Sequence, residues 1–140
     1  MAELSHRIKV FVYRRAGWEP DYLLLKPDQE SEGMWGPVQG PIAFDEKLET
    51  AIRRRVMDET GIPSSGQLID LQMPLRLTLG DEEIVEWCFG CQSLAHPDPR
   101  RLERHRAAFR WAPFPEAYPS LEFDADRAAI MRLHTLLQAA

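Results

Sequence analysis

The sequence predicts an α/β fold in a single domain, residues 1–140. Short segments with strict alternation of apolar and polar residues recur along the chain, and this period of two is typical of strands. Two longer segments instead repeat apolar residues at the spacing of a helix. The chain has 140 residues, 44% hydrophobic and 28% charged, which is the size and composition of one soluble globular domain with its own core.

The first predicted element is a hairpin. Residues 6–15, HRIKVFVYRR, alternate strongly, a turn follows over 17–21, and a second short strand covers 22–26. The two faces of the first strand carry Ile8, Val10 and Val12 on one side and Lys9, Phe11 and Tyr13 on the other. Two roles are open for its basic residues. The simpler interpretation is a solvated face that protects the edge; the other is contact of Arg7 or Lys9 with a substrate phosphate.

Residues 40–62, GPIAFDEKLETAIRRRVMDETGI, predict a loop, a helix and a second loop. Pro41 prevents an early start of the helix, and Asp45 is predicted to be its N-terminal cap or first-turn acid. Gly61 is the predicted C-terminal cap, because Pro63 cannot continue the helix.

One face of this helix changes from apolar to charged along its length. At about 100° per residue, six side chains fall in one arc: Phe44, Leu48, Ala51, Arg55, Asp58 and Glu59. A core helix would stay apolar, and a solvated helix would carry its charges on the far side, so the pattern indicates a polar site at the edge of the core. Adjacent carboxylates at 58 and 59 repel unless a cation lies between them, and such oxygen ligands suit Mg²⁺ or Mn²⁺. Ordinary ion pairs along the helix are the alternative.

A second hairpin is predicted after the helix. Residues 67–79 indicate one strand interrupted at Pro74, and residues 82–94 a longer strand after a turn at 80–81. The two faces of the longer strand carry Trp87, Phe89 and Cys91 on one side and Ile84, Glu86 and Cys88 on the other. Glu86 is therefore either a solvent-facing strand acid or a group that orients the substrate.

Cys88 and Cys91 are the two cysteines of the chain, with the spacing C-x-x-C. Residues three apart on a strand point to opposite faces, so the spacing fits neither a redox pair nor a metal clamp. Two core or half-buried thiols are expected instead.

The C-terminal third continues with a turn-rich loop over 95–99. Residues 100–110 contain five arginines and are interpreted as a solvated loop or as an electropositive lip over a polyphosphate. A last short strand is predicted over 109–113, and the prolines at 113, 115 and 119 predict an extended connector. The closing helix is predicted over 123–137, with Asp124 or Asp126 as its cap and with one apolar face of Ile130, Leu133 and Leu137.

Charge and hydropathy exclude several classes of partner. A net charge of −5 argues against general nucleic-acid binding and against an anionic membrane surface. No apolar run approaches the length of a membrane span, and the N-terminus lacks the pattern of a signal peptide. A cytoplasmic location is therefore expected.

The spacing within residues 40–62 resembles the Nudix box, whose pattern is Gly, five residues, Glu, seven residues, Arg-Glu-aliphatic-x-Glu-Glu-x-Gly-aliphatic. Gly40, Glu46, Arg54 and Gly61 stand in register. Two positions depart from the pattern, because Arg55 stands where the family has its first helix glutamate and an aspartate stands at position 58. The resemblance implies the Nudix fold, an α/β/α sandwich with a mixed β-sheet between helices. It also implies Mg²⁺- or Mn²⁺-dependent hydrolysis of a pyrophosphate bond in a nucleoside-diphosphate-linked compound or in a nucleoside or pterin triphosphate.

The resemblance assigns roles by position. The backbone carbonyl of Gln39 and the carboxylates of Asp58 and Glu59 match metal-binding positions, and Glu59 is also a catalytic position. Arg54 matches the arginine that braces the loop–helix–loop. Glu46 is expected either to pair with this arginine or to complete the metal shell.

Arg55 cannot bind metal or orient water as a cation. It is expected either to pair with a neighbouring carboxylate or to grip a substrate phosphate directly. Glu103 is the candidate for one further metal-binding acid of the family. No general base is visible at position 55, and Glu86 and Glu103 are the candidates to replace it.

The segment MWGPVQG over 34–40, which contains Trp35, resembles the residues before the Nudix box in the dihydroneopterin triphosphate pyrophosphatase subgroup. Two roles are open for Trp35: stacking on a base or pterin ring, or packing under the loop. The expected partner is a small nucleotide-like diphosphate or triphosphate, and many relatives are homodimers. The alternative function is a catalytically impaired Nudix domain that binds a nucleotide or a protein partner, because Arg55 replaces a glutamate of the box.

Overall fold

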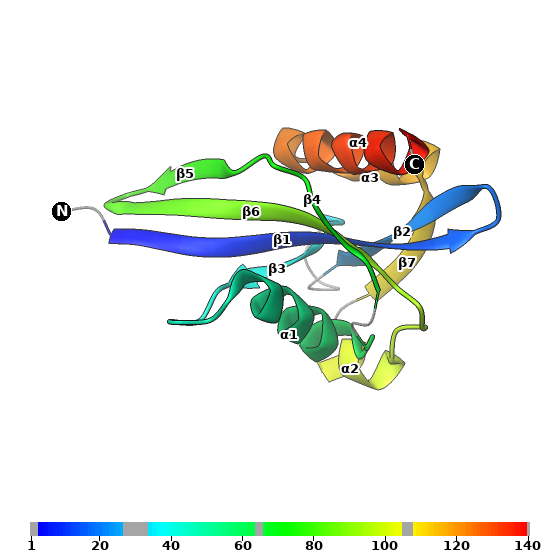
Figure 1. Cartoon of the computed structure of the whole chain (residues 1–140), viewed down its shortest axis with the longest axis horizontal. Helices are drawn as coiled ribbons and strands as arrows, with labels where there is room; N and C mark the ends of the chain where they lie inside the picture. Colours follow the sequence, from blue (N-terminus) through cyan, green and yellow to red (C-terminus); the bar gives the residue numbers. More distant parts are fainter. Residues whose placement is uncertain (1–2, 27–33, 64–65, 105–107, 140) are drawn as a thin grey trace.

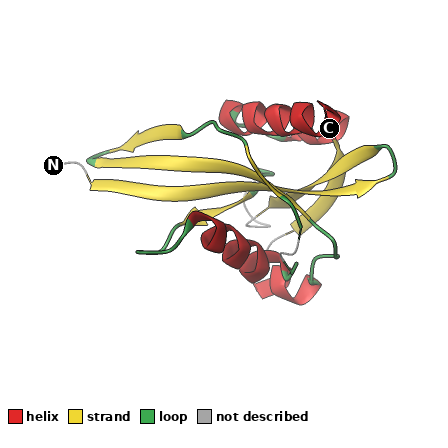
Figure 2. Ribbon diagram, viewed as in Figure 1, coloured by secondary structure: helices red, strands yellow, loops and turns green. Residues whose placement is uncertain are grey.

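The structure is a computed structural model that describes residues 3–26, 34–63, 66–104 and 108–139. One mixed β-sheet lies between two layers of helices, as Figures 1 and 2 show. Helices α1 (Leu48–Thr60) and α2 (Pro99–Arg104) cover one face. Helices α3 (Phe114–Ser120) and α4 (Asp124–Ala139) cover the other face. The predicted α/β/α sandwich is confirmed.

The sheet is built around two long neighbouring strands. Its strands in the described residues are β1 (Glu3–Ala16), β2 (Glu19–Lys26), β3 (Val38–Pro41), β4 (Leu68–Asp70), β5 (Leu75–Leu79), β6 (Glu82–Gln92) and β7 (Ala108–Pro113). Strands β1 and β6 are parallel, and every other pairing is antiparallel. The order is β4-β6-β1-β2-β7, while β3 pairs with the first half of β1 and β5 with the first half of β6. This arrangement brings β3 to the point where α1 begins.

The alternation in β1 and β6 places the two cores as predicted. Ile8, Val10, Val12, Phe89 and Cys91 lie in the core under α1. Phe11, Tyr13 and Cys88 lie in the core under α4, together with Ile130, Leu133 and Leu137 of that helix. The two cysteines are buried and free, on opposite faces of β6. Burial raises the pKa of the Cys88 thiol to about 11, so this thiol stays protonated and unreactive at neutral pH. None of the helices in the described ranges is long and apolar enough to cross a bilayer.

The predicted start of the first helix is wrong. The helix begins at Leu48 with Lys47 as its N-cap residue, and Asp45 lies in the preceding loop at φ 61. Phe44, predicted to share the helix face, is 96% exposed in that loop. A left-handed residue reverses the chain between β3 and α1, and a short aspartate tolerates this conformation better than most side chains. The C-terminal cap is as predicted, with Gly61 at φ 73.

Three other segments differ from the prediction. The strand predicted over 67–79 with an interruption at Pro74 is two short strands. The break covers residues 71–74 and includes Pro74 and Gln72, which takes a left-handed φ of 54. An extended connector was predicted from three prolines, but Pro113 ends β7, Pro115 lies in the first turn of helix α3 and Pro119 lies further inside that helix. A proline in the first turn of a helix costs little, because that N–H has no partner within the helix. The basic segment predicted as a loop opens with the short helix α2.

Candidate active site

The loop before α1 is fixed by a two-point contact between Glu46 and Arg54. Arg54 donates from Nε and Nη2 to the two carboxylate oxygens of Glu46, at 2.7 and 2.9 Å. The same carboxylate accepts a hydrogen bond from the backbone N–H of Ala43 at 3.0 Å. These donors, the Arg54 side chain first, lower the pKa of Glu46. The pairing expected between Glu46 and Arg54 is present, and it ties the loop to the helix.

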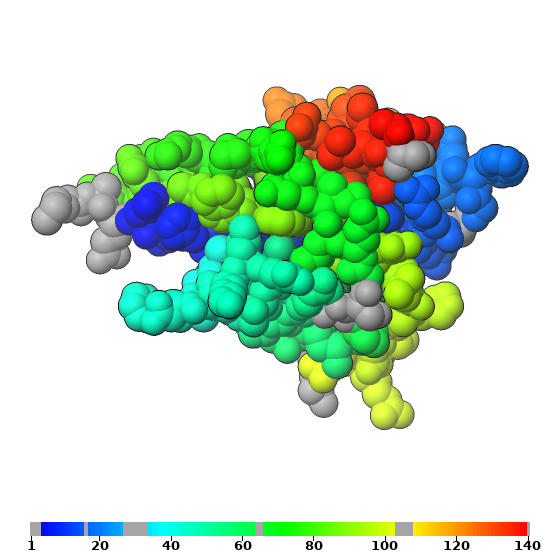
Figure 3. Space-filling view, in the orientation of Figure 1, coloured from blue at the N-terminus to red at the C-terminus, as the bar shows by residue number. Residues whose placement is uncertain are grey.

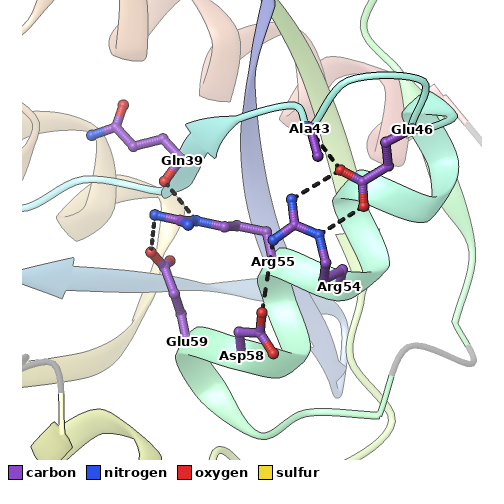
Figure 4. A network of polar contacts seen from close by, with 7 residues as sticks. All are labelled: Gln39, Ala43, Glu46, Arg54, Arg55, Asp58 and Glu59. Atoms are coloured by element: carbon purple, nitrogen blue, oxygen red, sulfur yellow. Dashed lines mark hydrogen bonds and ion pairs between the residues drawn. The ribbon is translucent and has the colours of Figure 1, made fainter.

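A second contact joins the helix to β3, and Figure 4 shows both contacts. Arg55 donates from Nε to the backbone carbonyl of Gln39 at 3.2 Å, and its Nη2 lies 3.1 Å from a carboxylate oxygen of Glu59. We call the Gln39 carbonyl and the side chains of Arg55 and Glu59 the helix cluster. Its two side chains are 30% and 21% exposed, respectively, so the cluster is open to ligand at the surface.

Gly40 provides the space that the guanidinium of Arg55 occupies. A β-carbon at position 40 would lie 2.4 Å from Nε and 2.5 Å from Cζ of Arg55, well inside van der Waals contact. The glycine that opens the box motif therefore allows the guanidinium to lie directly against the backbone of β3.

Asp58 lies outside the helix cluster. Its side chain is 53% exposed and lies 3.8 Å from Nη1 of Arg54. It therefore turns toward the Glu46–Arg54 pair, which we call the brace, and not toward Arg55 (Figure 4). The structure thus separates the two adjacent carboxylates predicted to share a metal. The third predicted acid, Glu103, has a side chain outside the described residues.

The donor set in the described residues does not fit a divalent metal. The Gln39 carbonyl and Glu59, which the family pattern assigns to metal, both contact the guanidinium of Arg55 instead. In the part of the chain that the structure describes, no three acidic, histidine or cysteine side chains are grouped as a metal site would require. A hard divalent cation needs several oxygen ligands free to coordinate it, and here a cation of the chain already contacts two of them.

On the other face of the sheet lies a buried ionic group that we call the sheet cluster: Lys9, Glu86 and Asp126. The Lys9 ammonium is 2.5 Å from Asp126 Oδ1 and 3.7 Å from Glu86 Oε1. The three side chains are only 6%, 8% and 4% exposed. Of the roles left open by the sequence, this burial excludes a solvated Lys9 and a solvent-facing Glu86. Asp126, offered together with Asp124 as a helix cap, lies in the first turn of α4 and pairs with Lys9. Helix α4 covers this end of the sheet and removes these charges from water.

A pocket of about 380 Å³ opens above the sheet cluster. It is lined by Arg7, Lys9, Gln39, Leu77, Leu79, Ile84, Glu86, Phe123, Ala125 and Asp126. Gln39 pairs with Lys9 in the ladder between β3 and β1, so its residue belongs to both sites. Its carbonyl contacts Arg55, while the residue lines the pocket. The pocket and the helix cluster are therefore neighbours joined by a single residue.

A larger hollow, of about 760 Å³, lies between the N-terminal part of β1 and the loop before α1. Figure 3 shows it below the blue end of β1 and above the cyan loop. Glu46 and Arg7 reach its lining, and His6 stacks on Trp87 there. The smaller pocket is the one of the two that contains Gln39 and the sheet cluster.

The predicted substrate residues are only partly brought together. Arg7 and Glu86 line the smaller pocket, and Arg55 adjoins it through Gln39. Trp35 instead lies under the cations of Lys26 and Arg110, each 5.5 Å from the ring, and its ring packs against the core below α4. This placement favours the packing role that the sequence left open for Trp35.

Asp126 is the residue of this pocket whose role sequence reasoning missed. The sequence offers it, with Asp124, as a helix cap, whereas in the structure it is 3% exposed and pairs with Lys9. One signal was present in the sequence: Lys9 shares its strand face with the apolar side chains of Phe11 and Tyr13, and a buried lysine requires an acid from another element.

Comparison with known protein families identifies the family of this chain. The family model described as NUDIX domain matches residues 5–133 of the chain. No curated protein matches the chain.

Several solved structures have the same fold at low identity. The C. elegans Ap4A hydrolase in a binary complex is 15% identical, with 97% of this chain and 99% of that chain covered and a TM-score of 0.74. The E. coli dihydroneopterin triphosphate pyrophosphohydrolase is 19% identical, with 96% and 98% covered and a TM-score of 0.72. The NUDIX domain of Shewanella oneidensis NrtR, complexed with ADP ribose, is 17% identical, with 98% and 90% covered and a TM-score of 0.68. At these identities the likeness concerns the fold.

Proposed function

The chain belongs to the Nudix family, and from this premise we propose that it hydrolyses a pyrophosphate bond in a nucleoside-diphosphate-linked compound or in a nucleoside or pterin triphosphate. The family's hydrolases act on nucleoside diphosphate derivatives. One observation carries the proposal for this chain: the helix cluster and the pocket above the sheet cluster meet at Gln39.

This adjacency suits a ligand with a phosphate end and an organic end. The guanidinium of Arg55 is a fork of donors that matches phosphate oxygens. The pocket offers apolar walls with the carboxylates of Glu86 and Asp126 at its base, and these can accept hydrogen bonds from ring or sugar donors. The named substrates and ligands of the similar structures, Ap4A, dihydroneopterin triphosphate and ADP ribose, all combine these two ends.

The reaction is an attack of water on one phosphorus atom of the pyrophosphate bond. A new P–O bond forms to the water oxygen, and the bond from that phosphorus to the bridging oxygen breaks, so the second phosphate leaves with the bridging oxygen. Glu59 is the carboxylate of the helix cluster. We assign it the role of the general base that accepts a proton from the attacking water. Arg55 balances the charge on the phosphate oxygens. Glu46 and Arg54 hold the loop and helix in place around this centre.

Nudix hydrolases generally use a divalent metal such as Mg²⁺. The predicted ligands Gln39, Asp58 and Glu59 would have to leave their arginine partners to hold one here. We therefore assign no step of the reaction to a metal and include Mg²⁺ and Mn²⁺ as variables of the assay.

The test is a screen for release of phosphate or pyrophosphate. Nucleoside triphosphates, sugar nucleotides, dinucleoside polyphosphates and dihydroneopterin triphosphate are each incubated with the protein in EDTA, Mg²⁺ or Mn²⁺. Turnover of at least one substrate is expected, and Glu59→Gln should reduce it by about 10² or more, since general-base catalysis is worth this much. Glu49→Gln is the matched control, because Glu49 lies on the same helix and pairs with Arg53.

Turnover that survives in Glu59→Gln would move the chemistry to another residue. No turnover of any substrate class would overturn the hydrolase and leave the second function, a domain that binds a nucleotide or a protein without cleaving it. That second function is favoured by the contacts of Arg55 in the helix cluster. A cytoplasmic location, a homodimer and the absence of a nucleic-acid partner stay predictions from the sequence.

A further inference from the structure

The helix cluster has the form of a cation site whose cation belongs to the chain. The two oxygens that face Arg55 come from different elements, the carbonyl of Gln39 from β3 and the carboxylate of Glu59 from α1. The guanidinium lies between them, 3.2 Å and 3.1 Å away. A positive charge of fixed position therefore bridges the strand and the helix at the edge of the pocket.

We propose that Arg55 replaces the divalent cation of this site, so that the protein binds the phosphate groups of its ligand through a guanidinium and without metal. This inference rests on the proposed function for the kind of ligand, and it goes beyond it by naming the group that holds the phosphates. It also accounts for both departures from the family pattern. A resident guanidinium makes a glutamate at position 55 unnecessary, and an aspartate at position 58 can face Arg54 because no metal requires it.

The remaining donors of Arg55 are available to a phosphate. Its contacts with Gln39 and Glu59 use Nε and Nη2, and the side chain is 30% exposed. A guanidinium carries five N–H donors in one plane, and the contacts above use two of its nitrogens. A phosphate can thus form charge-assisted hydrogen bonds without displacing Gln39.

A purely structural role for Arg55 is the competing explanation. An exposed i, i+4 ion pair such as Arg55–Glu59 contributes little to stability. The guanidinium also fills the space left by Gly40, however, because a β-carbon there would overlap its atoms. Close packing of a charged group against backbone, beside a pocket, fits a binding group better than a surface ion pair.

The first experiment measures binding of inorganic pyrophosphate by calorimetry in EDTA. The wild-type protein should bind, and Arg55→Met should bind about tenfold or more weakly, since charge-assisted hydrogen bonds to phosphate are lost. Arg53→Met, which removes the same charge from the same helix, is the matched control and should stay within about twofold of wild type. Circular dichroism and thermal melts show that each variant is folded.

Gly40→Ala tests the position of the guanidinium rather than its charge. The added methyl group overlaps Nε and Cζ of Arg55, and a long side chain moves away more easily than the backbone does. Pyrophosphate binding in EDTA should therefore weaken as in Arg55→Met, although the arginine is present. Affinity equal to wild type in this variant would contradict the proposal.

The second experiment titrates Mn²⁺ alone and follows the signal of the free ion by electron paramagnetic resonance. Arg55→Glu makes the site more negative by two charges and should take up more Mn²⁺ than wild type. Equal uptake by the two proteins, or wild-type binding of pyrophosphate only when Mg²⁺ or Mn²⁺ is present, would overturn the inference and leave the hydrolase proposal intact. Binding in EDTA with no turnover of any substrate would support the inference and overturn the hydrolase. A wild-type protein that binds pyrophosphate under neither condition would overturn the inference.

Discussion

The sheet cluster and the helix cluster both place one cation between oxygen acceptors, and they differ in their contact with water. Lys9, Glu86 and Asp126 are almost completely buried between the sheet and α4. Arg55 and Glu59 lie in the C-terminal half of α1, with 30% and 21% of their side-chain area exposed.

This difference decides what each cluster can do. A buried charge that loses its partner stays in a medium that solvates it poorly, so the sheet cluster has to keep its contacts. A half-exposed guanidinium can add or exchange a partner at low cost, because water and ligand both reach it. The sheet cluster therefore fixes the base of the pocket, and the helix cluster is the part that can respond to a ligand.

Removal of the buried cation is expected to have the largest effect on stability. Lys9→Met leaves Glu86 and Asp126 buried without a counter-charge and should lower the free energy of unfolding by about 3–5 kcal/mol. Urea unfolding followed by circular dichroism measures it.

Arg55→Met is the matched change in the other cluster. It should lower the free energy of unfolding by less than about 1 kcal/mol, as for an exposed ion pair. If both variants lost the same stability, the two clusters would not differ in the way that their burial indicates.

Substitution of one acid by its amide is expected to have an intermediate effect. Asp126→Asn keeps the shape of the side chain but weakens its contact with the Lys9 ammonium, and it should lower the free energy of unfolding by about 1.5–3 kcal/mol. Glu59→Gln, the corresponding change in the helix cluster, should stay below about 1 kcal/mol while reducing turnover. A stability loss in Glu59→Gln as large as that in Asp126→Asn would assign Glu59 a structural role.

The smallest effect concerns the brace beside the helix cluster. Because Arg54 lowers the pKa of Glu46 in the folded state, this pair contributes stability that is present above the ordinary value of 4.5 and is lost as pH falls through the lower folded value. The difference in unfolding free energy between wild type and Glu46→Gln should therefore be largest near neutral pH and should decrease as the pH falls below 4.5. A difference that does not change with pH would mean that the charge of Glu46 does not act through Arg54.

Local periodicity predicted the elements that depend on local backbone geometry. The faces of β1 and β6 were predictable because side chains alternate along any strand. The ends of the elements were less predictable. Asp45 has the chemistry of a helix cap, but it adopts a left-handed conformation in the loop before the helix. The prolines after β7 lie in helix α3 rather than in an extended connector.

For the site, sequence spacing predicted the contacts between side chains that are separated by only a few residues. Glu46 and Arg54 are joined across one loop, and Arg55 and Glu59 lie one turn apart on a helix. Spacing could not predict that Asp58 turns toward Arg54, since the choice between neighbouring partners depends on where each arginine is held.

The sequence by itself determined the family, the loop–helix–loop and the replacement of a box glutamate by Arg55. The tertiary structure decided where that arginine goes and which acid pairs with Lys9. Each contact joins two different elements: α1 to β3, the strand that precedes it, and β1 to α4, at the opposite end of the chain. Periodicity gives the direction of a side chain on its own element, whereas the group that it meets depends on which other element packs against that face.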